Sequence, residues 1–71
     1  MDLRNADTGK EYIIQAVETG DAELNSFLFS LGCYSGEPIT VVTRRRKNFT
    51  VSIKDSRYSI DDRLAAAIRI Q

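Results

Sequence analysis

The hydrophobic pattern of this 71-residue chain changes period between two closely spaced glycines, Gly32 and Gly36. Before Gly32, apolar residues recur at the three- and four-residue intervals that line one face of a helix: Leu24, Phe27, Leu28 and Leu31. After Gly36, they recur at every second residue, as in a strand with one buried face. A chain of this length builds a single core, so that core must combine a helix with several strands.

The helix has a start and a stop signal. Asp21 can accept hydrogen bonds from the free N–H groups of a first helical turn. Gly32 can adopt the left-handed conformation that ends a helix, because it has no Cβ. The residue after such a glycine often packs on the last turn, which gives Cys33 a structural role. We therefore expect an α-helix over about residues 21–32, with its apolar stripe in the core.

Five segments have the β-branched and aromatic composition of short strands. In the first, residues 10–18, Ile14 and Val17 lie three positions apart, and a β-bulge would bring both to the core. The last two strands are expected at residues 57–60 and 68–70. The two middle strands alternate clearly, and these residues are expected to face inward: Ile39, Val41, Phe49, Val51 and Ile53.

Polar residues mark the connections. The tripeptide RKN and the dipeptide DS are expected to be turns, with Asn48 and Asp55 suited to turn dihedrals. Asp61 and Asp62 are expected to open a single helical turn. Residues 1–8 form a short, mostly polar lead-in.

These elements predict a mainly β domain that spans residues 1–71. We expect a small, partly open barrel of about five short strands, with one inserted α-helix and a C-terminal helical turn. A barrel suits so many short strands because closure limits the exposed edges that invite aggregation.

The chain contains no histidine, which removes the usual general base at neutral pH and the commonest soft-metal ligand. Its single cysteine, Cys33, has no partner for a disulfide or a paired metal site, and is expected to be a buried, inert thiol. The acidic pairs Asp21 with Glu23 and Asp61 with Asp62 are better explained as helix starts than as metal ligands. We therefore expect no enzymatic activity, no cofactor and no specific metal site.

No segment approaches the roughly 20 apolar residues of a membrane span. The first ten residues also lack the apolar stretch of a signal peptide. The expectation is a cytoplasmic protein with no direct membrane insertion.

The zero net charge is distributed unevenly along the chain. Residues 1–43 carry seven acids and two bases, whereas residues 44–71 carry eight bases and three acids. The densest basic run consists of Arg44, Arg45, Arg46 and Lys47. This basic run can contact nucleic-acid phosphates, dock on an acidic protein face, or serve as a solvated strand end that deters edge pairing. The only aromatic residue near it, Phe49, is expected in the core, which weakens the nucleic-acid hypothesis.

Phe29 lies about 100° from Leu28 around the expected helix, off the apolar stripe. It can cover the end of the barrel beside Tyr34, or it can be an exposed aromatic anchor of the kind that dominates protein interfaces. We favour the anchor, with residues 29–34 as the docking surface. The candidate partner-binding residues are Phe29, Cys33, Tyr34, Arg44, Arg45, Arg46 and Lys47.

The order of glycine and apolar positions resembles the ferrous-iron transport A (FeoA) family. The matching positions run across nearly the whole chain: Gly9, Ile14, Val17, Leu24, Leu28, Leu31, Gly32, Gly36, Ile39, Val41, Ile60, Ala65, Ile68 and Ile70. Three places depart from the family pattern. Cys33 replaces a branched aliphatic residue, Ser35 replaces a frequent proline, and RKN replaces a glycine-proline type of turn.

The resemblance implies an SH3-like barrel with an inserted helix and a non-enzymatic role in ferrous iron transport. It implies an accessory protein that binds a membrane ferrous-iron permease, whose cytosolic part binds guanine nucleotide, and that is recruited to the inner face of the membrane. Similar domains form the C-terminal module of iron-dependent repressors of the diphtheria-toxin-repressor type. The leading hypothesis is thus a permease-binding accessory protein. The alternative is a nucleic-acid-binding module that uses the basic run.

Overall fold

One antiparallel sheet of five strands carries the core, in the order β4-β3-β2-β1-β5. The computed structural model describes residues 1–71. The elements in chain order are the 3-10 helix η1 (Leu3–Asn5), β1 (Glu11–Val17), α1 (Ala22–Ser30), β2 (Pro38–Arg45), β3 (Asn48–Ile53), β4 (Ser56–Asp61), α2 (Asp62–Ala67) and β5 (Ile68–Ile70). The sheet does not close, since β4 and β5 are its two edges. This is the mainly β, partly open architecture that the sequence predicts.

The inward-facing positions of the middle strands are confirmed. Every one of the five residues predicted to face inward on β2 and β3 is at most 4% exposed. The predicted bulge in β1 is also present, because the pairing with β5 shifts register between Ile14 and Ala16. It buries Ile14 and leaves Val17 half-buried against the core.

The first hairpin turn is one residue shorter than expected, and the second keeps its two residues but lies one position earlier, at Lys54 and Asp55, with Ser56 already in β4. The first turn holds only Arg46 and Lys47, with Arg46 at a φ of 52°, and Asn48 already pairs with Arg45 in the sheet. The prediction that Asn48 is a turn residue is therefore wrong, because β2 and β3 stay paired until only a two-residue turn connects them. The β3–β4 turn does contain Asp55, and Lys54 and Asp55 both have positive φ, as a two-residue turn of type I′ requires.

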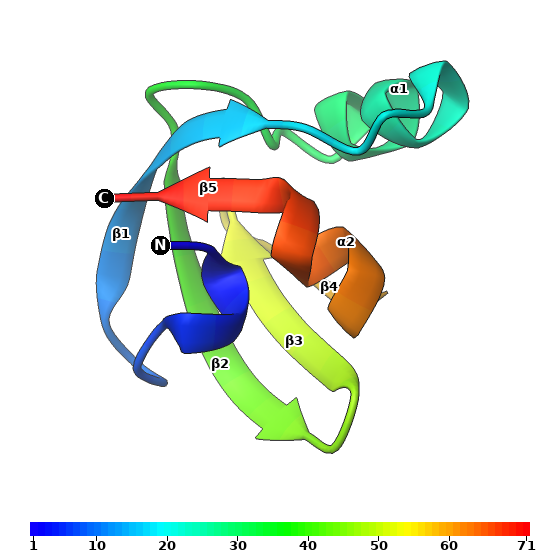
Figure 1. Ribbon diagram of the computed structural model, residues 1–71. Helices are drawn as coiled ribbons and strands as arrows, with labels where there is room; N and C mark the ends of the chain where they lie inside the picture. Colours follow the sequence, from blue (N-terminus) through cyan, green and yellow to red (C-terminus); the bar gives the residue numbers. More distant parts are fainter.

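The lead-in proves to be part of the core. Leu3 is fully buried and Ala6 is 1% exposed. Around them the chain forms η1, which lies against α2 on one side of the sheet (Figure 1). Two isolated apolar residues in a polar segment form no helical or strand pattern. The sequence alone therefore does not show that this segment packs against the core.

The caps of α1 agree with the sequence. The Asp21 carboxylate accepts hydrogen bonds from the N–H groups of Glu23 and Leu24, at 2.8 and 3.2 Å. At the other end the Cys33 N–H donates to the Leu28 carbonyl at 3.0 Å, and Gly32, at a φ of +98°, donates to the Phe29 carbonyl at 2.9 Å. These two bonds make a Schellman motif.

The predicted apolar stripe reaches the core at Leu28 and Leu31, and the prediction is wrong for Leu24 and Phe27. Leu28 is the one buried residue of α1, whereas Leu24 and Phe27 are 41% and 47% exposed. Figure 1 shows the reason, since α1 lies at one end of the molecule, beyond the sheet. A period shows which side chains share a helix face, but not whether another element covers that face.

We predict that Gly32→Ala destabilises the fold more than Gly20→Ala. Both glycines have positive φ, but a Cβ on Gly32 would lie 3.1 Å from Ile53 Cγ2, whereas one on Gly20 meets nothing within 4 Å. The backbone penalty alone should cost about 1 kcal/mol at Gly20, and roughly 2 to 3 kcal/mol is expected at Gly32. Urea denaturation midpoints measure both losses. Equal losses would show that the Ile53 side chain moves aside without cost.

We predict that Cys33 makes the fold less stable at alkaline pH. Cys33 is 2% exposed, and its burial raises the pKa of the thiol from 9.0 to about 11. The unfolded chain therefore loses this proton first, so the stabilisation is present below about pH 9 and is lost as the pH rises to about 11. Relative to Cys33→Val, which cannot ionise, the wild-type free energy of unfolding should fall by roughly 1 to 2 kcal/mol across that range. Parallel pH profiles of the two proteins would contradict the prediction.

Candidate docking surface around helix α1

Helix α1 has large apolar side chains on both flanks of its single buried residue. Leu28 points into the core, Leu24 and Phe27 lie on one flank, and Phe29 lies on the other. Phe29 is 61% exposed, the highest value among the large hydrophobic residues of the chain. Apolar side chains this exposed on a short helix are typical of protein docking sites.

The Phe29 flank is held by the segment that follows the helix. The Phe29 and Tyr34 rings lie 4.9 Å apart between centroids, tilted by 43°. Lys54, from the β3–β4 turn, places its ammonium 4.8 Å from the Tyr34 ring centroid and donates a hydrogen bond to the Tyr34 hydroxyl. It also lies 3.5 Å from a carboxylate oxygen of Glu37. The hydrogen bond to Tyr34 raises the pKa of Lys54, so the ammonium stays charged in this position.

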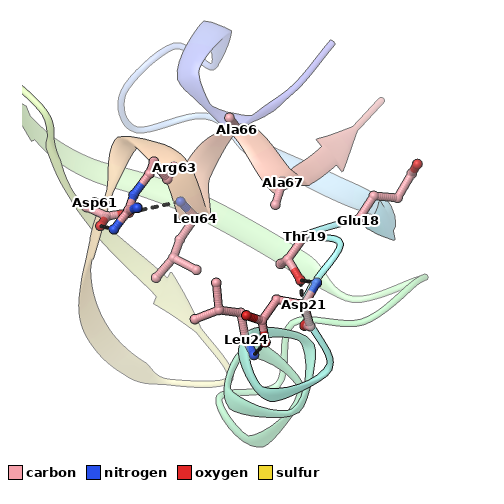
Figure 2. Close-up of a pocket in the computed structure, with 9 residues that line it drawn as sticks. All are labelled: Glu18, Thr19, Asp21, Leu24, Asp61, Arg63, Leu64, Ala66 and Ala67. Carbon is pink, nitrogen blue, oxygen red and sulfur yellow. Dashed lines mark hydrogen bonds and ion pairs between the residues drawn. The ribbon is translucent and has the colours of Figure 1, made fainter.

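The opposite flank forms one wall of a groove between α1 and α2, with a volume of about 440 Å³. Figure 2 shows the Leu24 and Leu64 side chains pointing toward one another across it. The complete lining is Glu18, Thr19, Asp21, Leu24, Asp61, Arg63, Leu64, Ala66 and Ala67. We call this the α1/α2 groove.

Two of the groove carboxylates also cap helices. Asp61 accepts a hydrogen bond from the Leu64 N–H at 2.9 Å, as Asp21 does at the start of α1. These caps confirm the helix-start roles expected for both residues. No group of three or more His, Cys, Asp or Glu side chains in the structure is arranged to hold a metal ion.

Two of the predicted docking residues have structural roles. Cys33 is buried, so it cannot contact a partner on this surface, and its prediction as a docking residue needs correction. Arg44 donates a hydrogen bond to the Ala6 carbonyl and lies over the Phe49 ring, 5.4 Å from its centroid. It therefore ties the lead-in to β3.

The remaining basic residues lie far from α1. Arg45, Arg46 and Lys47 are exposed at the β2–β3 turn, which Figure 1 places at the opposite end of the molecule from α1. None of them forms an ion pair, and Phe49 is buried, so no aromatic ring is available there for base stacking. The structure thus separates the candidate residues into two surfaces, and it brings together only Phe29 and Tyr34.

Sequence reasoning missed Lys54 and Leu64, which hold the two flanks of α1. Both lie more than 19 residues from the side chain they face, and neither belongs to a motif. The pairing of β3 with β4 and the packing of α2 place them, so no local signal in the sequence identifies them.

No helix of the structure has the length and apolar character needed to cross a bilayer.

Comparison with known proteins gives a family match over the full chain. A family model described as the FeoA domain matches residues 1–71. No curated protein sequence matches the chain.

Solved structures share the fold at low sequence identity. An iron uptake regulatory protein (FeoA) superposes with a TM-score of 0.90 at 21% identity, over 100% of this chain and 95% of that one. FeoA of Stenotrophomonas maltophilia, solved in complex with zinc and described as a procaryotic SH3 domain protein, superposes with a TM-score of 0.88 at 17% identity, over 100% and 89%. A manganese-dependent transcriptional repressor gives a TM-score of 0.86 at 18% identity, over 96% of this chain but only 39% of the repressor.

The fold is therefore SH3-like, as the resemblance implies. Since the family model spans every residue, the chain belongs to the FeoA domain family.

Proposed function

We propose that this chain is an accessory protein of ferrous iron transport that binds the cytosolic part of a membrane ferrous-iron permease through helix α1. The FeoA family is associated with ferrous iron transport and consists of small accessory domains. The observation that carries the proposal is the exposure of α1. Eight of its nine residues are exposed, and three of these are large and apolar.

The exposed side chains suit a protein partner. Aromatic residues dominate the binding energy of protein interfaces, and α1 presents Phe27 and Phe29 on a helix with both ends capped. Tyr34 and Lys54 hold Phe29 in place, so little conformational freedom is lost when a partner covers it. A preordered apolar surface of this kind supports docking as the main activity.

The side-chain chemistry of the chain argues against catalysis as the function. The chain lacks histidine, and its one thiol is buried with a pKa of about 11. Of the acidic residues around α1, Asp21 and Asp61 cap helices and Glu37 lies in an ion pair with Lys54. We therefore propose that the chain acts on transport by binding alone, at the cytoplasmic face of the membrane where its partner recruits it.

Substitutions on α1 should separate binding from folding. We expect Phe29→Ser and Phe27→Ser each to weaken binding to the permease by about 2 kcal/mol, or about 30-fold. Phe27→Ser should leave the melting temperature nearly unchanged, whereas Phe29→Ser also loses the ring contact with Tyr34, worth about 1 kcal/mol of stability. Titration of the purified permease with labelled protein, with and without guanine nucleotide, measures the affinity.

Ile13→Ser is the matched control for these variants. Ile13 is an exposed apolar residue, at 40%, but it lies on β1 rather than on α1. Its substitution should leave binding unchanged. Absence of permease binding by the wild-type protein in both nucleotide states would rule the proposal out, as would equal losses from Ile13→Ser and the two α1 variants.

A further inference from the structure

Strand β4 has an unpaired edge along its whole length. It pairs with β3 on one side and with no strand on the other. The second edge strand, β5, has three residues against the six of β4. The N-terminus also covers β5, because the Ile70 N–H donates to the Met1 carbonyl and Asp2 forms a bridge with Arg69. The β4 edge is therefore the place where this sheet can accept another strand.

The β3–β4 turn determines which backbone groups of this edge are free. A two-residue turn is closed by a hydrogen-bonded residue pair, here Ile53 with Ser56. Bonded and non-bonded pairs alternate along an antiparallel ladder, and the β3–β4 ladder has no bulge. Arg57 and Ser59 therefore direct their N–H and C=O groups away from β3, as Asp61 directs its N–H. No backbone hydrogen bond from a turn, loop or cap uses these groups, and all three residues are exposed.

The charges along the β4 edge are complementary to themselves. Arg57 and Asp61 lie two positions on either side of Ser59, on the same face of the strand. A second β4 laid antiparallel, with Ser59 opposite Ser59, places Arg57 of each copy opposite Asp61 of the other, which is a favourable cross-strand pair. Within the chain Arg57 forms no ion pair, and the guanidinium of Arg63 lies 3.8 Å from the Asp61 carboxylate, beyond hydrogen-bond distance. Both charges are thus available to a partner.

We propose that two copies of this chain associate through their β4 edges, antiparallel about a two-fold axis at Ser59. The Ser59 N–H of each copy then donates to the Ser59 carbonyl of the other, and each Asp61 N–H donates to the Arg57 carbonyl opposite it. On the other face of the strand, Tyr58 of each copy lies opposite Ile60 of the other, an aromatic and β-branched pair. The contact uses the same edge on both copies, so it closes as a dimer rather than growing into a fibre.

Other registers and other occupants fit less well. An axis at Arg57 places two arginines opposite one another, and an axis at Asp61 does the same with two carboxylates, so both are unfavourable. An axis at Tyr58 leaves Arg57 opposite Ser59, without a charge partner. An extended segment of another protein would satisfy the backbone groups, but nothing along the edge selects one. A second copy supplies both opposite charges at the required spacing.

Sedimentation equilibrium of the intact 71-residue protein measures the association. Concentrations from about 0.01 to about 1 mM are needed, because an interface made by one strand edge is small and its affinity is low. We expect an equilibrium between monomer and dimer, with the amide NMR signals of Arg57, Ser59 and Asp61 shifting as concentration rises. Ser59→Pro removes the central N–H, which has no acceptor within the chain, and should abolish the dimer without unfolding this edge strand.

Charge reversals test the register. Arg57→Glu should weaken the dimer at least about tenfold, because each new carboxylate faces Asp61 of the other copy. The matched control, Arg45→Glu, makes the same change in net charge at an exposed position of β2 and should leave the dimer unchanged. Asp61→Arg should also weaken the dimer, since it places two basic side chains opposite one another. A mixture of Arg57→Glu and Asp61→Arg should associate again, because each variant supplies the charge that the edge of the other lacks.

A wild-type protein that stays monomeric at the highest concentration would overturn the inference. So would a dimer that survives Ser59→Pro, equal effects of Arg57→Glu and Arg45→Glu, or a mixture of the two folded charge variants that does not associate. Asp61→Arg also removes the α2 cap, so its melting temperature is measured first. The other three variants decide the outcome if Asp61→Arg does not fold. The result is independent of the permease titration, which tests α1.

Discussion

The position of helix α1 depends on one buried side chain, Leu28. An isolated helix of nine residues is too short to be stable in water, so α1 requires contacts with the rest of the chain. Burial of a leucine contributes about 2 kcal/mol, and the Asp21 cap and the Schellman motif at Gly32 contribute at the two ends. Because a single residue points inward, every other large apolar side chain of the helix remains at the surface. The same geometry that makes α1 marginal as a core element makes it suitable for docking.

Much of the fold follows from local signals in the sequence. Alternation placed Ile39, Val41 and the inward face of β3 correctly, and short-range chemistry identified Asp21, Gly32 and Asp61 at the helix ends. These predictions succeed because the interactions span a few residues. The prediction failed for Leu24 and Phe27 because burial depends on which element lies opposite, and η1 and α2 fill the sheet interior there instead.

The candidate site also depends on contacts between residues that lie far apart in the sequence. Phe29 and Tyr34 are five residues apart, and their contact was one of the two alternatives that the sequence raised for Phe29. Lys54 reaches Tyr34 across 20 residues, and Arg44 reaches Ala6 across 38. The basic run looked uniform as a sequence, yet tertiary contacts fix its first residue, Arg44, and none of the other three forms such a contact. Only the packed structure distinguishes a structural arginine from its neighbours.

The zero net charge of the chain conceals two opposite local fields. The α1 end carries Glu18, Asp21 and Glu23, and the β2–β3 turn at the other end carries Arg45, Arg46 and Lys47 (Figure 1). The longest dimension of the molecule is 28 Å, whereas physiological salt screens charges over about 8 Å. A partner that approaches α1 therefore meets these acids together with Lys54 and Arg63, and the bases of the β2–β3 turn do not reach them. A net charge of zero is thus compatible with local charge at each end, because the fold keeps apart charges that the composition alone would balance.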